Sequence, residues 1–360
     1  MRDPRVEQYA RIMVETCVDV QPGWQVLVGG GFLGRPLIEE ITRQVARRGA
    51  YVLLRIGFDG SLAGSLGWAR EAPMKLLESP APLEAKLLEE VDALIVVEAP
   101  ENTRNMSALP QERLNALQAG VRPAIERVFR GEVPWVGGQY PTPALAQDAG
   151  MATEEFADFL YGAVLLDWDA ERERMRRYAE LFDAADEVRI AGGGTDLRLS
   201  IAGRTMSIDA GGRNLPGGEF FTSPVEDSAK GTIAFTEFPA VYAGRECQGI
   251  RLRFEDGRVV EASAEVHEDF LISTLDADDG ARRLGELGIG CNPGITRHMR
   301  NTLFDEKIDG TIHLALGNGI HEVGGQNESS IHWDIVKDLR NGGRIELDGE
   351  VVQENGAWTL

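Results

Sequence analysis

A histidine and an aspartate two residues apart stand out near the C-terminal end of the chain. They are His332 and Asp334, in the segment SSIHWDIV, where several neighbouring residues are apolar. In a β-strand, residues two apart point to the same face, so this imidazole and this carboxylate could reach one metal ion together. The segment alone also fits an edge strand whose histidine and aspartate are solvated.

A second histidine lies in another apolar segment. His313 sits in GTIHLALG, 19 residues before His332. A lone histidine in such a strand is more often a core residue than a ligand. Two apolar strands that each carry a histidine, one of them with an aspartate beside it, favour a metal site. Imidazole and carboxylate ligands suit zinc, iron, cobalt or manganese.

Two glutamates occupy unusual settings in the same half of the chain. Glu219 follows NLPGG and precedes FFTSP, which predicts that it begins an aromatic strand after a glycine turn. Glu286 lies between Leu284 and Leu287 in GARRLGELGIG, where a solvated glutamate is the ordinary expectation. The chemistry of these residues alone assigns neither glutamate to the site.

The first half of the chain alternates strand-like and helix-like segments. Residues 24–32, WQVLVGGGF, are an apolar run that ends in glycines. Residues 36–50 form a helical pattern that starts with proline and has Gly49 near its end, and the strand-like YVLLRIG follows. This alternation predicts an α/β domain over residues 1–185, with a mostly parallel sheet covered on both faces.

The glycines after the first strand match the pattern of a dinucleotide-binding loop. Gly29, Gly31 and Gly34 fit G-x-G-x-x-G between a strand and a helix. Such a site also needs an acidic residue at the end of the next strand. That strand ends near Arg55. Asp59 lies just beyond the strand, so the acidic residue is not at the position that the pattern requires. We therefore favour an ordinary strand-to-helix turn and predict no nucleotide cofactor.

The second half of the chain has a different pattern of apolar and polar residues. A long helical stretch at residues 154–185 is followed by short alternating runs between Gly and Asp turns. GIRLRFEDGRVVEASAE predicts a hairpin that turns at Asp256-Gly257, and one helical piece is expected near residues 269–287. Residues 186–360 are therefore predicted to form a mainly β (α+β) domain that carries the metal site.

Composition narrows the class of protein. The net charge of -21 argues against binding to nucleic acid or to an anionic membrane. No apolar run approaches the roughly 20 residues of a membrane span, and the N-terminus lacks the apolar core of a signal peptide. Three cysteines that lie far apart, Cys17, Cys247 and Cys291, favour neither disulfides nor a cysteine zinc site. We expect a cytoplasmic protein.

Four segments in the second half resemble one known family. They are, in chain order, GGRNLPGGEFFTSPVEDSAKGTI, GARRLGELGIGCN, NTLFDEKIDGTIHLALG and SSIHWD. Together with AADEVRI and GTDLRLSIAGR at the predicted domain junction, they are similar to the thermophilic metallo-aminopeptidase family of the aminopeptidase T type. The resemblance covers the second half well and the first half only in its general pattern.

The resemblance implies a peptide-cleaving enzyme with two divalent metal ions, zinc, cobalt or manganese, that acts as a homodimer. Carried over by motif, the implied metal ligands are Glu219, Glu286, His313, His332 and Asp334. Glu286 is also expected to relay protons. One position departs from the family pattern: a site tyrosine seven residues after His313 is Ile320 here, followed by His321. Isoleucine can neither ligate nor donate a hydrogen bond.

The leading hypothesis is a metal-dependent aminopeptidase that removes N-terminal residues from peptides with a metal-activated water. One alternative is a mononuclear Fe(II) ring-cleaving dioxygenase, related to 2,5-dihydroxypyridine dioxygenase, with a triad of His313, His332 and Asp334. The presence of both glutamates favours two metals over this triad. A further alternative is a non-catalytic binding protein that descends from the family and has kept the pocket.

Overall fold

The structure is a computed structural model that describes residues 3–58, 66–121, 126–242 and 244–359. The chain forms two compact units. The first consists of residues 1–166 and 211–217, and the second of residues 167–210 and 218–360. The predicted boundary near residue 186 lies just before a strand of the second unit, and as a limit between domains it stays a prediction.

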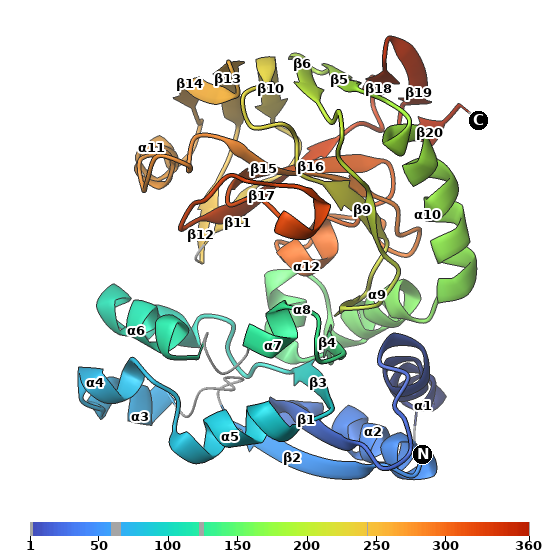
Figure 1. Ribbon diagram of the computed structural model, residues 1–360, viewed down its shortest axis with the longest axis vertical. Helices are drawn as coiled ribbons and strands as arrows, with labels where there is room; N and C mark the ends of the chain where they lie inside the picture. The colour runs from blue at the N-terminus through green and yellow to red at the C-terminus, as the bar shows by residue number, and fades with distance from the viewer. Residues whose placement is uncertain (1–2, 59–65, 122–125, 243, 360) are drawn as a thin grey trace. The chain divides into compact units, whose positions relative to one another are not determined.

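The first unit is built on a parallel sheet with the strand order β2-β1-β3-β4-β8 (Figure 1). The strands are β1 (Gln25–Gly31), β2 (Tyr51–Gly57), β3 (Ala93–Glu98), β4 (Trp135–Gln139) and β8 (Asn214–Leu215). Its described α-helices are α1 (Pro4–Arg11), α2 (Arg35–Arg47), α3 (Leu66–Glu71), α4 (Met74–Leu77), α5 (Pro82–Glu90), α6 (Gln111–Val121), α7 (Glu126–Phe129), α8 (Pro143–Asp148) and α9 (Thr153–Val164). The prediction of an α/β domain with a mostly parallel sheet is confirmed.

The glycines at the end of β1 have a packing role. A Cβ atom built on Gly31 would lie 2.6 Å from the backbone oxygen of Ala99, and one on Gly34 would lie 2.8 Å from a methyl group of Val97. Both neighbours belong to β3 or to the residues after it. These glycines let the turn into α2 lie directly against β3, which gives them a reason that needs no phosphate.

The second unit is antiparallel. One sheet has the order β14-β13-β10-β6-β5-β18-β19-β20, another has the order β17-β16-β15-β9-β7, and β11 and β12 form a separate ribbon (Figure 1). The strands are β5 (Glu187–Gly192), β6 (Thr195–Ser200), β7 (Ser207–Asp209), β9 (Glu219–Thr222), β10 (Lys230–Phe235), β11 (Ala240–Tyr242), β12 (Arg245–Cys247), β13 (Ile250–Glu255), β14 (Arg258–Ser263), β15 (Leu284–Gly290), β16 (Thr311–Gly317), β17 (His332–Asp338), β18 (Arg344–Leu347), β19 (Glu350–Glu354) and β20 (Ala357–Trp358). The described α-helices of this unit are α10 (Trp168–Asp183), α11 (Glu268–Leu275) and α12 (Thr302–Asp305). The predicted mainly β second half is confirmed.

Two local predictions have different outcomes. The hairpin is confirmed, because β13 and β14 pair across Asp256 and Gly257, whose positive φ angles of 47° and 74° suit a tight hairpin turn. The helical piece near residues 269–287 is too long. Helix α11 ends at Leu275, and Glu286 lies on strand β15. A short apolar run with glycines does not by itself distinguish a strand from a helix.

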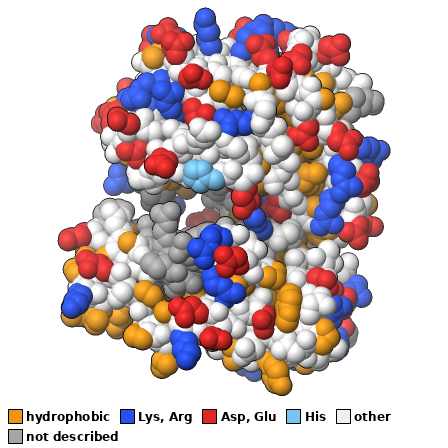
Figure 2. Space-filling model, in the orientation of Figure 1, with side chains coloured by type: hydrophobic (Ala, Val, Ile, Leu, Met, Phe, Trp, Pro, Cys, Tyr) orange, Lys and Arg blue, Asp and Glu red, His pale blue; other side chains and the backbone are white. Residues whose placement is uncertain are grey.

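Acidic and basic side chains are interspersed over the face shown in Figure 2. Among the helices in the described part of the chain, none is long and apolar enough to cross a membrane.

Candidate metal centre

All five implied ligands lie on one face of the sheet formed by β17, β16, β15, β9 and β7. Directly paired residues share a face, and Ala315 of β16 pairs with both Glu286 and Asp334. Three further pairs place the other ligands by the same rule: Gly288 pairs with His313, Gly290 with Glu219, and Gly317 with His332. The two-residue period of each strand keeps these rows on one side of the sheet.

The opposite face of the same sheet belongs to the core. Phe220, next to Glu219, is fully buried and packs edge-to-face on Phe182 of α10, with 5.3 Å between the ring centroids. Trp333, between the two implied ligands of β17, is 1% exposed. Burial of these rings fixes the register, because a slip of one residue would turn every ligand into the apolar side.

Small residues leave space for the polar groups. Gly288 lies opposite His313, and a Cβ atom built there would lie 2.0 Å from the imidazole Cε1. A register shift between Leu284 and Glu286 interrupts the ladder just before Glu286. Such bulges re-aim side chains next to functional sites. The sequence LGELGIG therefore forms a strand that carries one carboxylate and makes room for a neighbouring ring.

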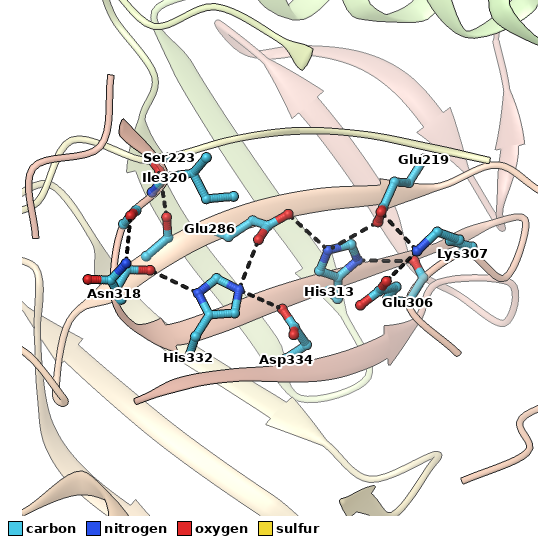
Figure 3. A network of polar contacts seen from close by, with 12 residues as sticks. Glu219, Ser223, Glu286, Glu306, Lys307, His313, Asn318, Ile320, His332 and Asp334 are labelled. Carbon is cyan, nitrogen blue, oxygen red and sulfur yellow. Dashed lines mark hydrogen bonds and ion pairs between the residues drawn. The ribbon is translucent and has the colours of Figure 1, made fainter. Parts of the chain in front are cut away.

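Glu286 lies between the two histidines (Figure 3). Its Oε1 is 3.4 Å from His313 Nε2, and its Oε2 is 3.1 Å from His332 Nε2. Glu219 Oε2 lies 3.5 Å from His313 Nε2, and Asp334 Oδ1 lies 3.4 Å from His332 Nε2. The five side chains form one row in which carboxylates and imidazoles alternate.

The far nitrogen of each imidazole is held by a backbone carbonyl. His313 Nδ1 lies 3.0 Å from the oxygen of Glu306, and His332 Nδ1 lies 2.9 Å from the oxygen of Asn318. A carbonyl oxygen only accepts hydrogen bonds, so Nδ1 carries the hydrogen in both rings. The Nε2 atoms are thereby aimed at the carboxylates, which is the usual arrangement of metal-binding histidines.

The residues present fit a divalent metal. Potential ligand atoms of Glu219, Glu286 and His313 lie within 4.8 Å of one another, and so do those of Glu286, His332 and Asp334. Glu219 Oε2 and Asp334 Oδ1 are buried and accept no hydrogen bond in the structure. Buried carboxylate oxygens without a donor are costly, and a cation at either position would satisfy them.

The raised pKa values of the two histidines also indicate that the carboxylates of the centre need positive charge beside them. Burial lowers the pKa of His332, but its contacts with Asp334 and Glu286 outweigh burial and raise the pKa to about 12. For His313, burial also lowers the pKa, and Glu286 and Glu219 raise it to about 10. Without a metal, protons on both rings must balance the carboxylates.

The two buried glutamates have different environments. Burial raises the pKa of Glu219 to about 8, and Lys307 only partly opposes this effect. Burial also acts to raise the pKa of Glu286, but the two histidines outweigh it and lower the pKa to about 2. Glu286 is only 6% exposed, so the structure does not support the alternative of a solvated surface glutamate.

Sequence reasoning missed two residues beside the centre. Glu306 forms a possible ligand group with His313 and Asp334. Lys307 is completely buried, and its ammonium contacts Glu219 and Glu306. Both lie in FDEKIDG, which is part of the segment NTLFDEKIDGTIHLALG. The sequence feature that could have indicated them is a pair of charged residues shortly before a buried strand.

The structure also shows the surroundings of Ile320, which stands where the family pattern has a tyrosine. The N–H of Ile320 donates to the hydroxyl of Ser223, which donates in turn to the backbone oxygen of Gly285 (Figure 3). His321 is exposed, its Nδ1 lies 2.9 Å from the oxygen of Gly325, and it belongs to none of the possible ligand groups among the described residues.

The fold and the site describe a protein with a candidate metal centre on an antiparallel sheet. The model of the thermophilic metalloprotease (M29) family matches residues 2–358, and the chain therefore belongs to this family. This result confirms the resemblance, and it confirms an enzyme of the metallo-aminopeptidase class at the level of the family.

Individual relatives match over nearly the whole chain. Aminopeptidase 2 of Geobacillus stearothermophilus is 27% identical, covering 99% of this chain and 98% of the relative. Aminopeptidase T of Thermus thermophilus is also 27% identical, covering 98% and 96%. The solved structure of wild-type AmpT from Thermus thermophilus has a TM-score of 0.85 at 25% identity, covering 99% of each chain.

A second solved structure shares the fold. The structure of 2,5-dihydroxypyridine dioxygenase from Pseudomonas putida KT2440 has a TM-score of 0.61 at 17% identity, covering 99% of this chain and 96% of that one. At this identity the similarity concerns the fold alone.

Proposed function

We propose that this protein is a metal-dependent aminopeptidase that hydrolyses N-terminal residues from peptides, with two divalent ions in the centre on β9, β15, β16 and β17. The observation that carries the proposal is the position of Glu286 between the two histidines. Its Oε1 lies 3.4 Å from His313 Nε2, and its Oε2 lies 3.1 Å from His332 Nε2. A carboxylate that faces two imidazoles in this way suits a bridge between two ions.

The chemistry of the ligand set supports the proposal. Three carboxylates and two neutral imidazoles carry a charge of about -3, which nearly balances two divalent ions. When bound, such ions lower the pKa of a shared water and polarise the substrate carbonyl. Zinc, cobalt and manganese all suit this mixture of nitrogen and oxygen ligands.

The protein's own residues supply orientation and proton transfer. The carbonyls of Glu306 and Asn318 fix the two imidazoles, and the apolar far side of the sheet fixes the strands. We also propose that Glu286 relays a proton from the attacking water to the leaving amine. His332 is 35% exposed at its side chain, so substrate can approach from the edge of the sheet formed by β17.

The alternatives receive less support. A single-iron dioxygenase needs His313, His332 and Asp334 around one ion, but the two histidines fall in separate ligand groups among the described residues. A binding protein without metal would have to balance three closely spaced, largely buried carboxylates with protons on both imidazoles, and such a buried charged cluster is costly.

Metal content by mass spectrometry tests the proposal, with His332→Ala as the variant and His321→Ala as the matched control. We expect about two zinc, cobalt or manganese ions per chain, a loss of metal in His332→Ala, and full content in His321→Ala. One iron per chain would instead support the dioxygenase. No metal under any loading condition would contradict both enzymes.

Substrate and assembly are further parts of the proposal. The metal-loaded protein should release the first residue of a peptide with a free N-terminus and leave its N-acetylated counterpart intact. We also propose a homodimer, which light scattering would test, and a cytoplasmic location, in keeping with three cysteines that lie far apart in the sequence.

A further inference from the structure

A buried lysine lies inside the acidic centre. Lys307 is 0% exposed, and its Nζ lies 3.0 Å from Glu219 Oε1 and in close contact with Glu306 Oε1 (Figure 3). Its position is fixed by the chain, because it directly follows Glu306, whose carbonyl holds the imidazole of His313. A buried ammonium needs such partners, since an unpaired one would be very costly.

The ammonium lies on one side of the centre only. It takes one oxygen of Glu219 and leaves Oε2 without a hydrogen bond, 3.5 Å from His313 Nε2. In the described part of the chain, the ion pairs of Glu286 and Asp334 are with histidines. Among the described residues, the Glu219 side of the centre therefore already holds a lysine ammonium, whereas the ion pair of Asp334 is with a histidine.

We propose that Lys307 is a resident cation that weakens metal binding on the Glu219 side, so that the two metal ions bind with unequal affinity. This inference rests on the proposed two-metal function. The tight position is the group of Glu286, His332 and Asp334, and the weak position is the group of Glu219, Glu286 and His313.

The reason is electrostatic. Like charges a few ångströms apart in a protein interior repel strongly enough to change an affinity at least tenfold. Any ion bound to Glu219 Oε2 shares that carboxylate with the ammonium of Lys307, whereas an ion beside Asp334 shares its carboxylates with neutral imidazoles. The first ion should fill the Asp334 side, and the second should enter only at higher metal concentration.

Titration of the full-length, metal-free chain with zinc in a calorimeter tests this order. The natural protein should show two binding constants that differ by about tenfold or more. In Lys307→Gln the weaker constant should tighten by roughly tenfold or more, and the tighter one should stay within about threefold. The matched control is Lys337→Gln, which removes another buried lysine, paired with Glu237, from the same sheet. It should leave both constants unchanged.

A second variant keeps the inference testable if Lys307→Gln does not fold. Glu219→Gln retains the lysine with Glu306 and should abolish only the weaker binding event. Loss of the tighter event in Glu219→Gln, or an unchanged weaker constant in Lys307→Gln, would overturn the inference and leave the two-metal function standing. If the natural protein binds no zinc, the proposed function fails, and the inference fails with it.

Discussion

Two buried, glycine-rich strands in this protein look alike in sequence and do different things. Strand β1 of the first unit reads QVLVGGG, and strand β15 of the second reads LGELGIG. A Cβ atom on Gly31 of β1 would meet the backbone oxygen of Ala99 at 2.6 Å. A Cβ atom on Gly288 of β15 would meet the imidazole of His313 at 2.0 Å.

Both strands lie inside their sheets, and the glycines of both allow another group to approach closely. The two strands differ in which group lies next to the glycine. In β1 the close neighbour is backbone, so the glycine serves packing between strand and turn. In β15 the neighbour is a ring that belongs to the candidate metal centre. A glycine in a strand thus reports a close approach, and only the residue across from it tells whether that approach serves the core or the chemistry.

The largest effect that would test this comparison is expected from Gly288→Ala. The added methyl group would force the ring of His313 away from Glu286 and Glu219. A displacement of about 1 Å in a catalytic arrangement can lower activity about 100-fold. We expect a 10- to 100-fold loss of aminopeptidase activity, by the same argument, together with loss of the ion on the Glu219 side. Peptide hydrolysis and metal content measure the two effects.

Gly162→Ala is the control for this experiment. Gly162 lies on an exposed face of α9, and a Cβ atom there would meet nothing within 4 Å. Alanine in a helix is favoured over glycine, so this variant should be as stable as the natural protein or more so. A fully active Gly288→Ala with two bound ions would show that His313 is not part of the site.

The candidate centre was predictable where local rules apply. His332 and Asp334 share a strand, and the two-residue period alone puts them on one face. His313 repeats the pattern in a second apolar strand. The fold class could likewise be read from alternating strand and helix patterns in the first half and from short strands with glycine turns in the second.

The rest depends on long-range contacts. The bulge beside Glu286 is visible only once β15 and β16 are paired, and without it LGELG fits a helix as well as a strand. Glu306 and Lys307 look like surface charges in the sequence. The burial of Lys307 and the position of the half-buried Glu306 follow from the path of the chain between α12 and β16, which places them against Glu219 and His313. Sequence spacing carries no information on such a contact.

A smaller effect, confined to stability, is expected from Gly31→Ala in β1. The methyl group would collide with a backbone oxygen that cannot rotate away, and overpacking of this kind costs on the order of 1–3 kcal/mol. Chemical denaturation would measure the loss in the free energy of unfolding. Metal content should remain that of the natural protein. A change in bound metal would break the comparison, because it would connect the glycines of β1 to the centre.

The last effect is a dependence of stability on pH, which should be larger in the metal-free protein than in the metal-loaded one. His313 has a pKa raised to about 10 by Glu286 and Glu219 against the opposing effect of burial. A histidine whose pKa is raised by folding contributes stability that is complete below its unfolded value near 6.5 and is lost as the pH rises toward 10. Glu219, with its pKa raised by burial to about 8, acts in the same direction, because it must give up a proton in the folded state as the pH rises.

The chelator-treated protein should therefore unfold at a lower temperature at pH 9.5 than at pH 6.5, by a few degrees. The zinc-loaded protein should show a smaller shift, since the metal takes the place of the protons between the carboxylates. Gly31→Ala should keep this difference between the two forms, because β1 contributes no group to the centre. Thermal unfolding followed by circular dichroism measures it. An equal shift with and without zinc would mean that the histidines are not the groups that balance these carboxylates.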